Sequence, residues 1–317
     1  MLWDIFLITL GLGLLVVAGD MLVKGAVSLA LKLGIPALIV GLTIVAFGTS
    51  APEMMVSIAA VLDHVPAIAL GNVIGSNTAN VLLVLGLPAL IATIHTAEHD
   101  TRESAVIMIG ATVLFILVCF LGPIGWPHAL VLLGALALIL GRQIHHAICH
   151  RNRREEEIEG ADPHLPGWKI AAYIGAGLVG LPFGADFLVE GSSSIARAFG
   201  ISEAVIGLTL VAVGTSLPEL ATSITAARKG HADVALGNVI GSNIFNLLSI
   251  IGFAGLVSPL PVPAQMLAVD LWVMLGASLL VLPFVFNGWP IGKRVGLVFT
   301  ALYGIYVIAL VIGDKLI

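Results

Sequence analysis

The chain contains the same pair of phrases twice, at one constant spacing. GLTIVAFGTSAPEMMVS at Gly41–Ser57 returns as GLTLVAVGTSLPELATS at Gly207–Ser223, with 11 of 17 positions identical. ALGNVIGSNTAN at Ala69–Asn80 returns as ALGNVIGSNIFN at Ala235–Asn246, with 10 of 12 identical. Both second copies lie 166 residues after the first. Because the spacing is the same for both phrases, the sequence predicts that one long block has been duplicated.

Composition places this duplicated block in a membrane. Hydrophobic residues make up 59% of the 317 residues and charged residues only 10%, whereas a soluble chain of this length needs far more polar surface. A membrane-spanning helix takes about 20 apolar residues. The sequence therefore predicts an all-α polytopic membrane protein with ten transmembrane helices and the lipid bilayer as its surroundings. The ten candidate spans lie near residues 3–30, 36–61, 66–94, 103–121, 126–143, 169–196, 202–227, 233–258, 266–286 and 293–313.

The spans divide evenly around one polar stretch. Residues 1–141 hold the first five spans, residues 142–168 form a charged linker, and residues 169–317 hold the second five. An odd number of spans per repeat means that the second copy enters the membrane from the opposite side. The sequence thus predicts two inverted five-helix repeats, an arrangement that is typical of secondary transporters.

The distribution of positive charge predicts the orientation of these repeats. Lys and Arg accumulate on the cytoplasmic side of membrane proteins. With the N-terminus outside, only Arg197 and Lys315 of the 14 basic residues lie outside. We therefore expect a multi-pass protein of the plasma (inner) membrane with both termini outside and the linker in the cytoplasm. The twelve cytoplasmic residues are Lys24, Lys32, Arg102, Arg142, Arg151, Arg153, Arg154, Lys169, Arg228, Lys229, Lys293 and Arg294.

The first phrase of each repeat carries a helix break beside a carboxylate. In Gly48–Glu53 and Gly214–Glu219, a proline lacks an amide hydrogen and clashes with the preceding turn, so it ends or kinks its helix. Two hydroxyl residues precede each proline and a glutamate follows it. These groups supply only hard oxygen donors, without His or Cys, and such sites suit Ca²⁺ or Na⁺ rather than transition metals. The hydroxyl residues are Thr49, Ser50, Thr215 and Ser216.

The second phrase predicts the opposite wall of the same site. Ser76 and Asn80 lie four residues apart and share a helix face, and so do Ser242 and Asn246. The glycines that precede these residues in the two copies of the phrase allow helices to approach closely; they are Gly71, Gly75, Gly237 and Gly241. The remaining asparagines are expected to hydrogen-bond neighbouring helices or broken-helix backbone more than to bind ions; they are Asn72, Asn77, Asn238 and Asn243.

Charge counting favours a divalent cation or several monovalent ones. Glu53 and Glu219 buried together repel each other, and a bound Ca²⁺ neutralises both, as several Na⁺ or H⁺ also do. Four other interpretations of these residues exist. Structural salt bridges are disfavoured, because no Lys or Arg lies in the apolar middle of a span. The hydroxyls alternatively bond to their own helix carbonyls. A channel could use the same ligands, whereas an intramembrane hydrolase would need a nucleophile–base pair or a metal motif that is not seen.

The doubled GTSAPE/GTSLPE and GNVIGSN phrases strongly resemble the repeats of the sodium/calcium exchangers, within the cation/Ca²⁺ antiporter superfamily. The resemblance covers essentially the whole chain and matches a short prokaryotic-type member. It implies Na⁺/Ca²⁺ antiport by alternating access and a cluster of ion sites at mid-membrane. It further implies that the protein is not an enzyme, and no cofactor, nucleic acid or protein partner is expected beyond the transported Ca²⁺ and Na⁺.

The same resemblance assigns roles to individual residues. Glu53 and Glu219 would be the central ligands, flanked by the four hydroxyl residues and by the carbonyls of Ala46 and Ala212. Ser76, Asn80, Ser242 and Asn246 would face them from the third and eighth helices. Some relatives, notably the potassium-dependent ones, carry Asp at the positions of Asn80 or Asn246. The two amides therefore argue against K⁺ co-transport, and the intact Thr-Ser pairs favour Na⁺ over H⁺ coupling.

Overall fold

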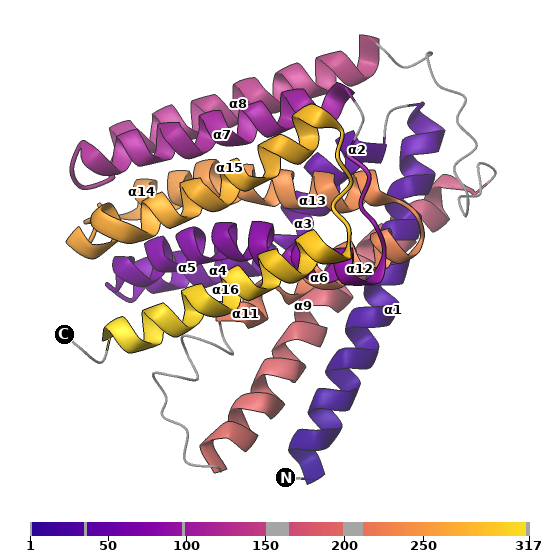
Figure 1. Cartoon of the computed structure of the whole chain (residues 1–317), viewed down its shortest axis with the longest axis horizontal. Coiled ribbons are helices and arrows are strands. Elements are labelled where there is room, and N and C mark those ends of the chain that lie inside the picture. Colours follow the sequence, from indigo (N-terminus) through magenta and orange to yellow (C-terminus); the bar gives the residue numbers. More distant parts are fainter. Residues whose placement is uncertain (1, 35–36, 97–98, 150–164, 199–211, 315–317) are drawn as a thin grey trace.

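The computed structural model describes residues 2–34, 37–96, 99–149, 165–198 and 212–314. Within these ranges the chain is helical, and its only β-type pairings are two isolated bridges, Ile94 with Ile291 and Ile124 with Leu260 (Figure 1). Each bridge ties a loop of the first half to a loop of the second half. The all-helical fold predicted from the composition is therefore confirmed for the described residues.

The described residues contain eight helical spans that are long and apolar enough to cross a membrane, and a ninth span if one bent helix pair is counted. Ten were expected. The remaining expected span, 202–227, lies partly outside the described residues. The elements are α1 Leu2–Leu33, α2 Ala37–Val40, η1 Gly41–Val45, α3 Ala46–Thr49, α4 Ala51–Leu62, α5 Pro66–Ala79, η2 Asn80–Val84, α6 Gly86–Ile91, α7 His99–Phe120, α8 Trp126–Cys149, α9 Gly167–Ala198, α11 Ala212–Thr215, α12 Leu217–Arg228, α13 Ala232–Phe245, η4 Asn246–Ile250, α14 Ile251–Val257, η5 Met266–Asp270, α15 Leu271–Asn287 and α16 Lys293–Asp314.

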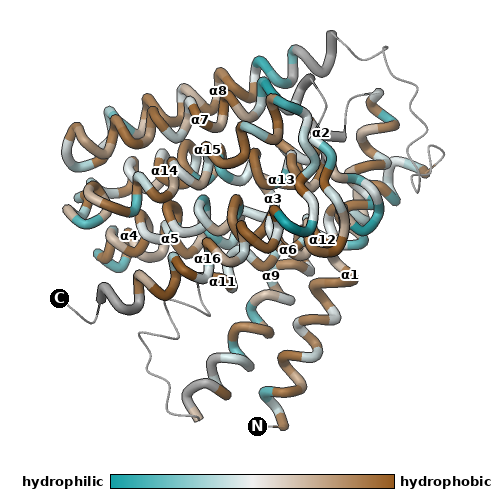
Figure 2. Tube along the Cα trace, viewed as in Figure 1, coloured by the Kyte–Doolittle hydropathy of each residue, from teal (hydrophilic) through white to brown (hydrophobic). Residues whose placement is uncertain are grey.

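Two spans form the centre of the molecule. In the most apolar window of Val234–Val257, 89% of the residues are buried, and the corresponding figure for Pro66–Ile91 is 72%. The windows of the other six spans are 11–50% buried. The outer helices carry large apolar side chains on their exposed faces. Figure 2 shows that hydrophobic residues predominate along α7, α8 and α15. This pattern fits central helices that carry polar residues and a lipid-facing shell.

Helices α1 and α9 pack against each other along their length in opposite directions. A methyl group on Gly191, near the end of α9, would lie 2.6 Å from the carbonyl oxygen of Asp4 at the start of α1. One on Gly25 of α1 would lie 2.8 Å from Ile174 near the start of α9. Gly11 and Gly184 meet in the middle of the pair. The first helices of the two halves are thus antiparallel, and their small residues allow this close approach (Figure 1).

Glycine also sets the distance between α13 and the broken helix of the first half. A Cβ atom on Gly241 would lie 2.5 Å from the carbonyl oxygen of Leu42 and 2.6 Å from Cβ of Ala46. The sequence prediction of close packing at this glycine is confirmed. Its counterpart Gly75 has open space within 4 Å among the described residues, so the two halves differ at this point.

Replacing Gly241 by Ala is expected to destabilise the protein by about 1–3 kcal/mol, because backbone atoms of η1 would have to move. The unfolding temperature in detergent measures this effect. Gly110→Ala is the matched control, since Gly110 lies in α7 with nothing within 4 Å of the added methyl group. Equal unfolding temperatures for the two variants would show that α13 and η1 do not depend on this close contact.

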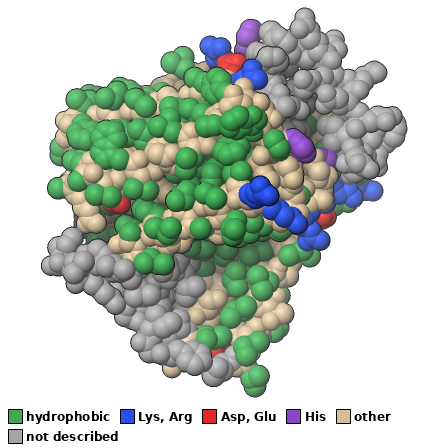
Figure 3. All heavy atoms as spheres, in the orientation of Figure 1, with side chains coloured by type: hydrophobic (Ala, Val, Ile, Leu, Met, Phe, Trp, Pro, Cys, Tyr) green, Lys and Arg blue, Asp and Glu red, His purple; other side chains and the backbone are tan. Residues whose placement is uncertain are grey.

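Basic side chains gather at one end of the bundle. Figure 3 shows Lys and Arg along one margin of the molecule, away from the end where α1 begins. Lys229 pairs with Asp20 at 2.6 Å, and Arg142 pairs with Glu103 at 2.8 Å. The Asp20 side chain is half exposed in this pair. Helix α8 continues to Cys149 and α9 begins at Gly167, so part of the expected linker 142–168 is helical.

Candidate functional site

The glutamates lie directly after two helix breaks. Ser50 separates α3 from α4 with φ −80° and ψ 2°, and Ser216 separates α11 from α12 with φ −90° and ψ 5°. The first break bends the span by 47°. In both cases the proline sits in the first turn of the new helix, where its missing amide hydrogen is not needed. The breaks therefore place Glu53 and Glu219 in the first turns of α4 and α12.

Both carboxylates are completely buried and poorly satisfied. Glu53 and Glu219 have 0% exposure. Neither oxygen of Glu53 has a hydrogen-bond partner, and neither does Oε2 of Glu219. No described Lys or Arg forms an ion pair with either residue, so the interpretation as structural salt bridges finds no support in the described part of the chain. A buried carboxylate without a donor or counter-ion is costly, which points to an occupant that supplies positive charge.

Hydroxyls from each half face the carboxylate of the other half. Ser50 Oγ donates to Glu219 Oε1 at 3.3 Å. Ser216 in turn faces Glu53, whereas Thr49 and Ser242 lie beside Glu219. The two carboxylates are near enough to repel each other. The structure thus brings six of the predicted residues into one cluster that both halves build.

Two asparagines hold the glutamate backbones in place. Asn72 Nδ2 donates to the Glu53 carbonyl oxygen at 3.2 Å and to Ser57 Oγ at 3.0 Å. Asn238 Nδ2 makes the equivalent bonds to the Glu219 carbonyl oxygen and to Ser223 Oγ, both at 3.3 Å. The expectation that these asparagines bond to broken-helix backbone is confirmed. The roles of the two serines were missed, although their repetition at the end of the first phrase was a usable signal.

The threonines connect these amides across the halves. Thr49 Oγ1 lies 3.2 Å from Asn238 Oδ1 and 3.3 Å from the Ala46 carbonyl oxygen, and its single proton can serve only one of them. Thr215 Oγ1 lies 3.5 Å from Asn72 Oδ1. For Thr49, the bond to its own helix carbonyl is therefore one of two alternatives. Each amide links a threonine of one half to the glutamate of the other.

A second pair of asparagines fixes the crossing of α5 and α13. Asn77 Nδ2 donates to the Asn243 carbonyl oxygen at 3.1 Å, and Asn243 Nδ2 donates to the Asn77 carbonyl oxygen at 3.3 Å. Asn80 Nδ2 adds a bond to Asn243 Oδ1 at 3.0 Å. These bonds agree with the predicted packing role of both residues. They also make the halves unequal, because both amide atoms of Asn246 are buried without a partner.

The remaining predicted ligands are buried but differ in availability. Asn80 Oδ1 and Ser242 Oγ have no partner, and Ser76 is buried on α5. The Ala46 carbonyl oxygen already accepts from the Ser50 amide at 3.0 Å and lies near the Thr49 hydroxyl, so an ion would compete for it. Ala212 is the first residue of α11. Asn80 and Asn246 each begin a π-helical turn.

The chemistry of this cluster is that of a hard-cation site. Carboxylates, hydroxyls and amides present oxygen atoms, and the two carboxylates carry a formal charge of about −2 when both are ionised. Among the described residues there is no group of three His, Cys, Asp or Glu side chains that would hold a transition metal. Fold and site together describe a multi-pass membrane protein with a buried candidate cation site to which both halves of the chain contribute.

Comparison with known proteins gives the family. The sequence model described as "Sodium/calcium exchanger protein" matches residues 3–145 and 169–312, and the chain belongs to this family. The sodium/calcium exchanger MaX1 of Methanosarcina acetivorans is 34% identical over 343 aligned positions, covering 97% of this chain and 98% of that protein. The inner membrane protein YrbG of Escherichia coli is 36% identical over 285 positions, covering 86% of each.

A solved structure has the same fold. The sodium-calcium exchanger NCX_Mj, in crystals soaked with zero Na⁺ and Ca²⁺, superposes with a TM-score of 0.85 at 32% identity. The superposition covers 98% of this chain and 99% of that one. The resemblance noted from the doubled phrases is therefore confirmed.

Proposed function

We propose that this protein exchanges Na⁺ for Ca²⁺ across the membrane by alternating access and extrudes Ca²⁺. Glu53 and Glu219 supply the negative charge of the site. Thr49, Ser50, Thr215, Ser216, Ser76, Ser242, Asn80 and Asn246 add side-chain oxygens, and Ala46 and Ala212 add carbonyl oxygens. Membership of the exchanger family supports this assignment.

One observation carries the proposal. Two glutamates from equivalent helix breaks lie completely buried in one cluster, and three of their four carboxylate oxygens have no hydrogen-bond donor. Only bound cations or protons can compensate these charges, because no described basic side chain reaches them. A site that Ca²⁺ or several Na⁺ can neutralise in turn is suited to exchange.

The architecture that we propose is ten helices in two inverted repeats, residues 1–141 and 169–317, joined by the linker 142–168. The antiparallel packing of α1 against α9 supports the inversion, because these are the first helices of the two repeats. The gathering of basic residues at one end supports a cytoplasmic linker and external termini. The protein would reside in the plasma (inner) membrane.

The deciding experiment is ⁴⁵Ca²⁺ uptake into proteoliposomes under outward gradients of Na⁺, K⁺ or H⁺, applied one at a time. We expect saturable uptake with the Na⁺ gradient and little with the other two. The alternative functions, H⁺-coupled or K⁺-dependent exchange, predict uptake with a proton gradient or a requirement for K⁺ beside Na⁺. Calcium flux that needs no counter-gradient and does not saturate would instead indicate a channel.

The orientation gives a separate prediction. In a variant without Cys119 and Cys149, Glu156→Cys is expected to react with an impermeant thiol reagent only in inside-out vesicles, and Asp314→Cys only in right-side-out vesicles. The charge asymmetry is the reason. Labelling of both positions from the same side would contradict the inverted repeats, and complete labelling after detergent treatment is the control for reactivity.

A further inference from the structure

An ion pair joins the first helix of the chain to the helix that carries Glu219. Lys229, at the end of α12, lies with Nζ 2.6 Å from Asp20 Oδ1 of α1 and donates to the Asp20 carbonyl oxygen at 3.5 Å. The Lys229 side chain is 32% exposed and the Asp20 side chain 52%. Both residues lie outside the ion cluster, and the proposed binding of Na⁺ and Ca²⁺ does not use them.

The ion pair lies beside a tightly packed contact between α1 and α12. A methyl group on Gly19 would lie 3.1 Å from Thr225 Oγ1 and 3.3 Å from the Ala221 carbonyl oxygen. Both contacted residues lie on α12 between Glu219 and Lys229. Helix α1 therefore covers the part of α12 that leads from the ion cluster to the basic end of the molecule, which is the cytoplasmic end in the proposed orientation.

The equivalent part of the first half is exposed. The repeat spacing of 166 residues relates Ala221 and Thr225 to Met55 and Ala59 of α4. Met55 is 73% exposed, and Ala59 is exposed as well. Helix α9, the counterpart of α1, thus leaves this part of α4 open. Equivalent parts of inverted repeats lead to opposite sides of the membrane, so the structure describes a state that is closed toward the cytoplasm.

The charges at the two equivalent places also differ. Asp186 of α9 corresponds to Asp20, and Asp63 follows α4 as Lys229 follows α12. If α9 packed on α4 as α1 packs on α12, two aspartates would meet there, and they cannot form an ion pair. An ion pair between the first helix of a repeat and the broken helix of the other repeat is therefore available on the cytoplasmic side only.

We propose that Asp20 and Lys229 form a latch that stabilises the state in which the ion cluster is closed to the cytoplasm. Opening toward the cytoplasm separates α1 from α12 and breaks the ion pair. This inference rests on the proposed alternating access, and adds to it a preference for one of the two states. Because the pair is partly exposed, we expect its contribution to the equilibrium to be a factor of about two to five.

Distances between two spin labels test the latch without measuring transport. The labels are attached to Leu33→Cys at the end of α1 and Trp289→Cys between α15 and α16, both at exposed positions, in the full-length protein without Cys119 and Cys149. Pulsed electron paramagnetic resonance is recorded in Na⁺, in Ca²⁺ and without either ion. We expect two distances, one for each state, and a ratio of open to closed molecules that rises about threefold in Lys229→Gln.

Three further variants separate the latch from general charge effects. Exchanging the charges, Asp20→Lys together with Lys229→Asp, should restore the ratio of the unmodified protein. Asp63→Lys should raise the ratio of open to closed molecules about threefold, because the new lysine can pair with Asp186 only when α9 packs on α4. Adding Asp186→Asn to this variant should abolish the rise.

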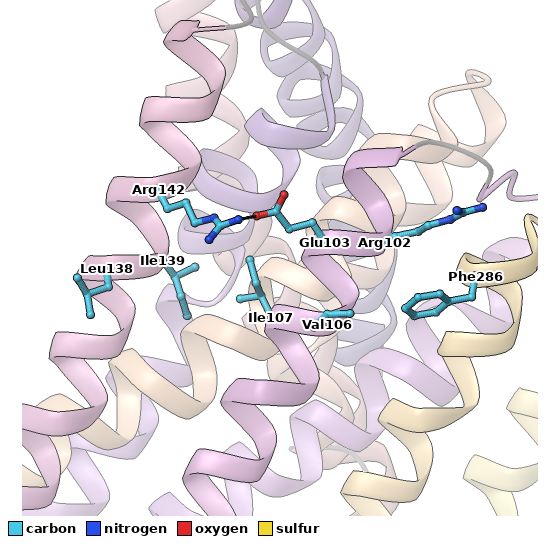
Figure 4. Close-up of a pocket in the computed structure, with 8 residues that line it drawn as sticks. All are labelled: Arg102, Glu103, Val106, Ile107, Leu138, Ile139, Arg142 and Phe286. Carbon is cyan, nitrogen blue, oxygen red and sulfur yellow. Dashed lines mark ion pairs between the residues drawn. The ribbon is translucent and has the colours of Figure 1, made fainter.

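Arg142→Gln is the matched control. It breaks an ion pair of similar length, 2.8 Å to Glu103, which joins α7 to α8 and does not involve α1 (Figure 4). The ratio should not change in this variant, and a rise equal to that of Lys229→Gln would overturn the proposal. Two distances with an unchanged ratio in Lys229→Gln would overturn the latch and leave alternating access standing. A single distance in every ion condition would contradict both.

Discussion

Glu53→Gln and Glu219→Gln are each expected to reduce Na⁺-driven Ca²⁺ flux to background. The substitution keeps the size of the side chain but lowers the site charge from −2 to −1, which no longer balances Ca²⁺. Hard-cation affinity depends on the number of charged ligands. Removing one partner from a buried charge pair costs about 3–5 kcal/mol. We therefore expect a loss of at least about a hundredfold in flux at a fixed Ca²⁺ concentration.

The measurement is ⁴⁵Ca²⁺ uptake into proteoliposomes with matched protein content. Asp63→Asn is the control, because Asp63 is an exposed carboxylate at the other end of the same helix α4. It should transport normally. If Glu53→Gln or Glu219→Gln retained near-normal uptake, that glutamate would not be a charged ligand of the transported ion.

Asn246→Asp is expected to make exchange sensitive to acid. Both amide atoms of Asn246 are buried without a partner, so a carboxylate fits without breaking a described bond. Three carboxylates around one Ca²⁺ leave one charge that a proton or a second cation must balance. If a proton must leave before Ca²⁺ binds, the apparent affinity for Ca²⁺ falls about tenfold for each unit by which the pH is lowered. Stimulation by K⁺ is also expected if the added charge creates a fitting site.

Asn80→Asp is the informative comparison. Asn80 Nδ2 donates to Asn243 Oδ1, and an aspartate would place two acceptors against each other there. This variant should lose about 1–3 kcal/mol of stability, unlike Asn246→Asp. Exchange is measured across pH with and without K⁺, together with the unfolding temperature. Superimposable pH profiles for Asn246→Asp and the unmodified protein would show that Asn246 does not line the ion path.

The sequence predicts which side chains gather around Glu53 and Glu219, because the signals for this cluster are local. The proline and glycine around Glu53 are sufficient to predict a helix break, and the repeat transfers the prediction to Glu219. The polar residues of α5 and α13 also indicate that these two helices lie at the centre of the molecule. A helix that carries buried polar side chains must face other protein rather than lipid.

What the sequence did not predict depends on relations between distant helices. The π-helical turns at Asn80 and Asn246 change the helix geometry over five residues, and apolar periodicity averages over longer windows. The reciprocal bonds of Asn77 and Asn243 depend on the angle at which α5 crosses α13. The charged end of α8 was taken for linker, because exposed helical residues such as Arg142 resemble a polar loop in composition.

The buried polar atoms without partners around Glu53 and Glu219 bear on how the protein avoids uncoupled ion transport. Suppose that a conformational change closed the site to water on both sides while no ion was bound. Two carboxylates and several amide and hydroxyl groups would then be buried without partners, and their burial would cost several kcal/mol or more. The protein can therefore switch sides readily only when it is loaded. After Ca²⁺ is released on one side, the site would then have to bind other cations before it could change back. Coupling between the release of one cation and the binding of another would thus follow from buried polar groups that have no hydrogen-bond partner in the protein.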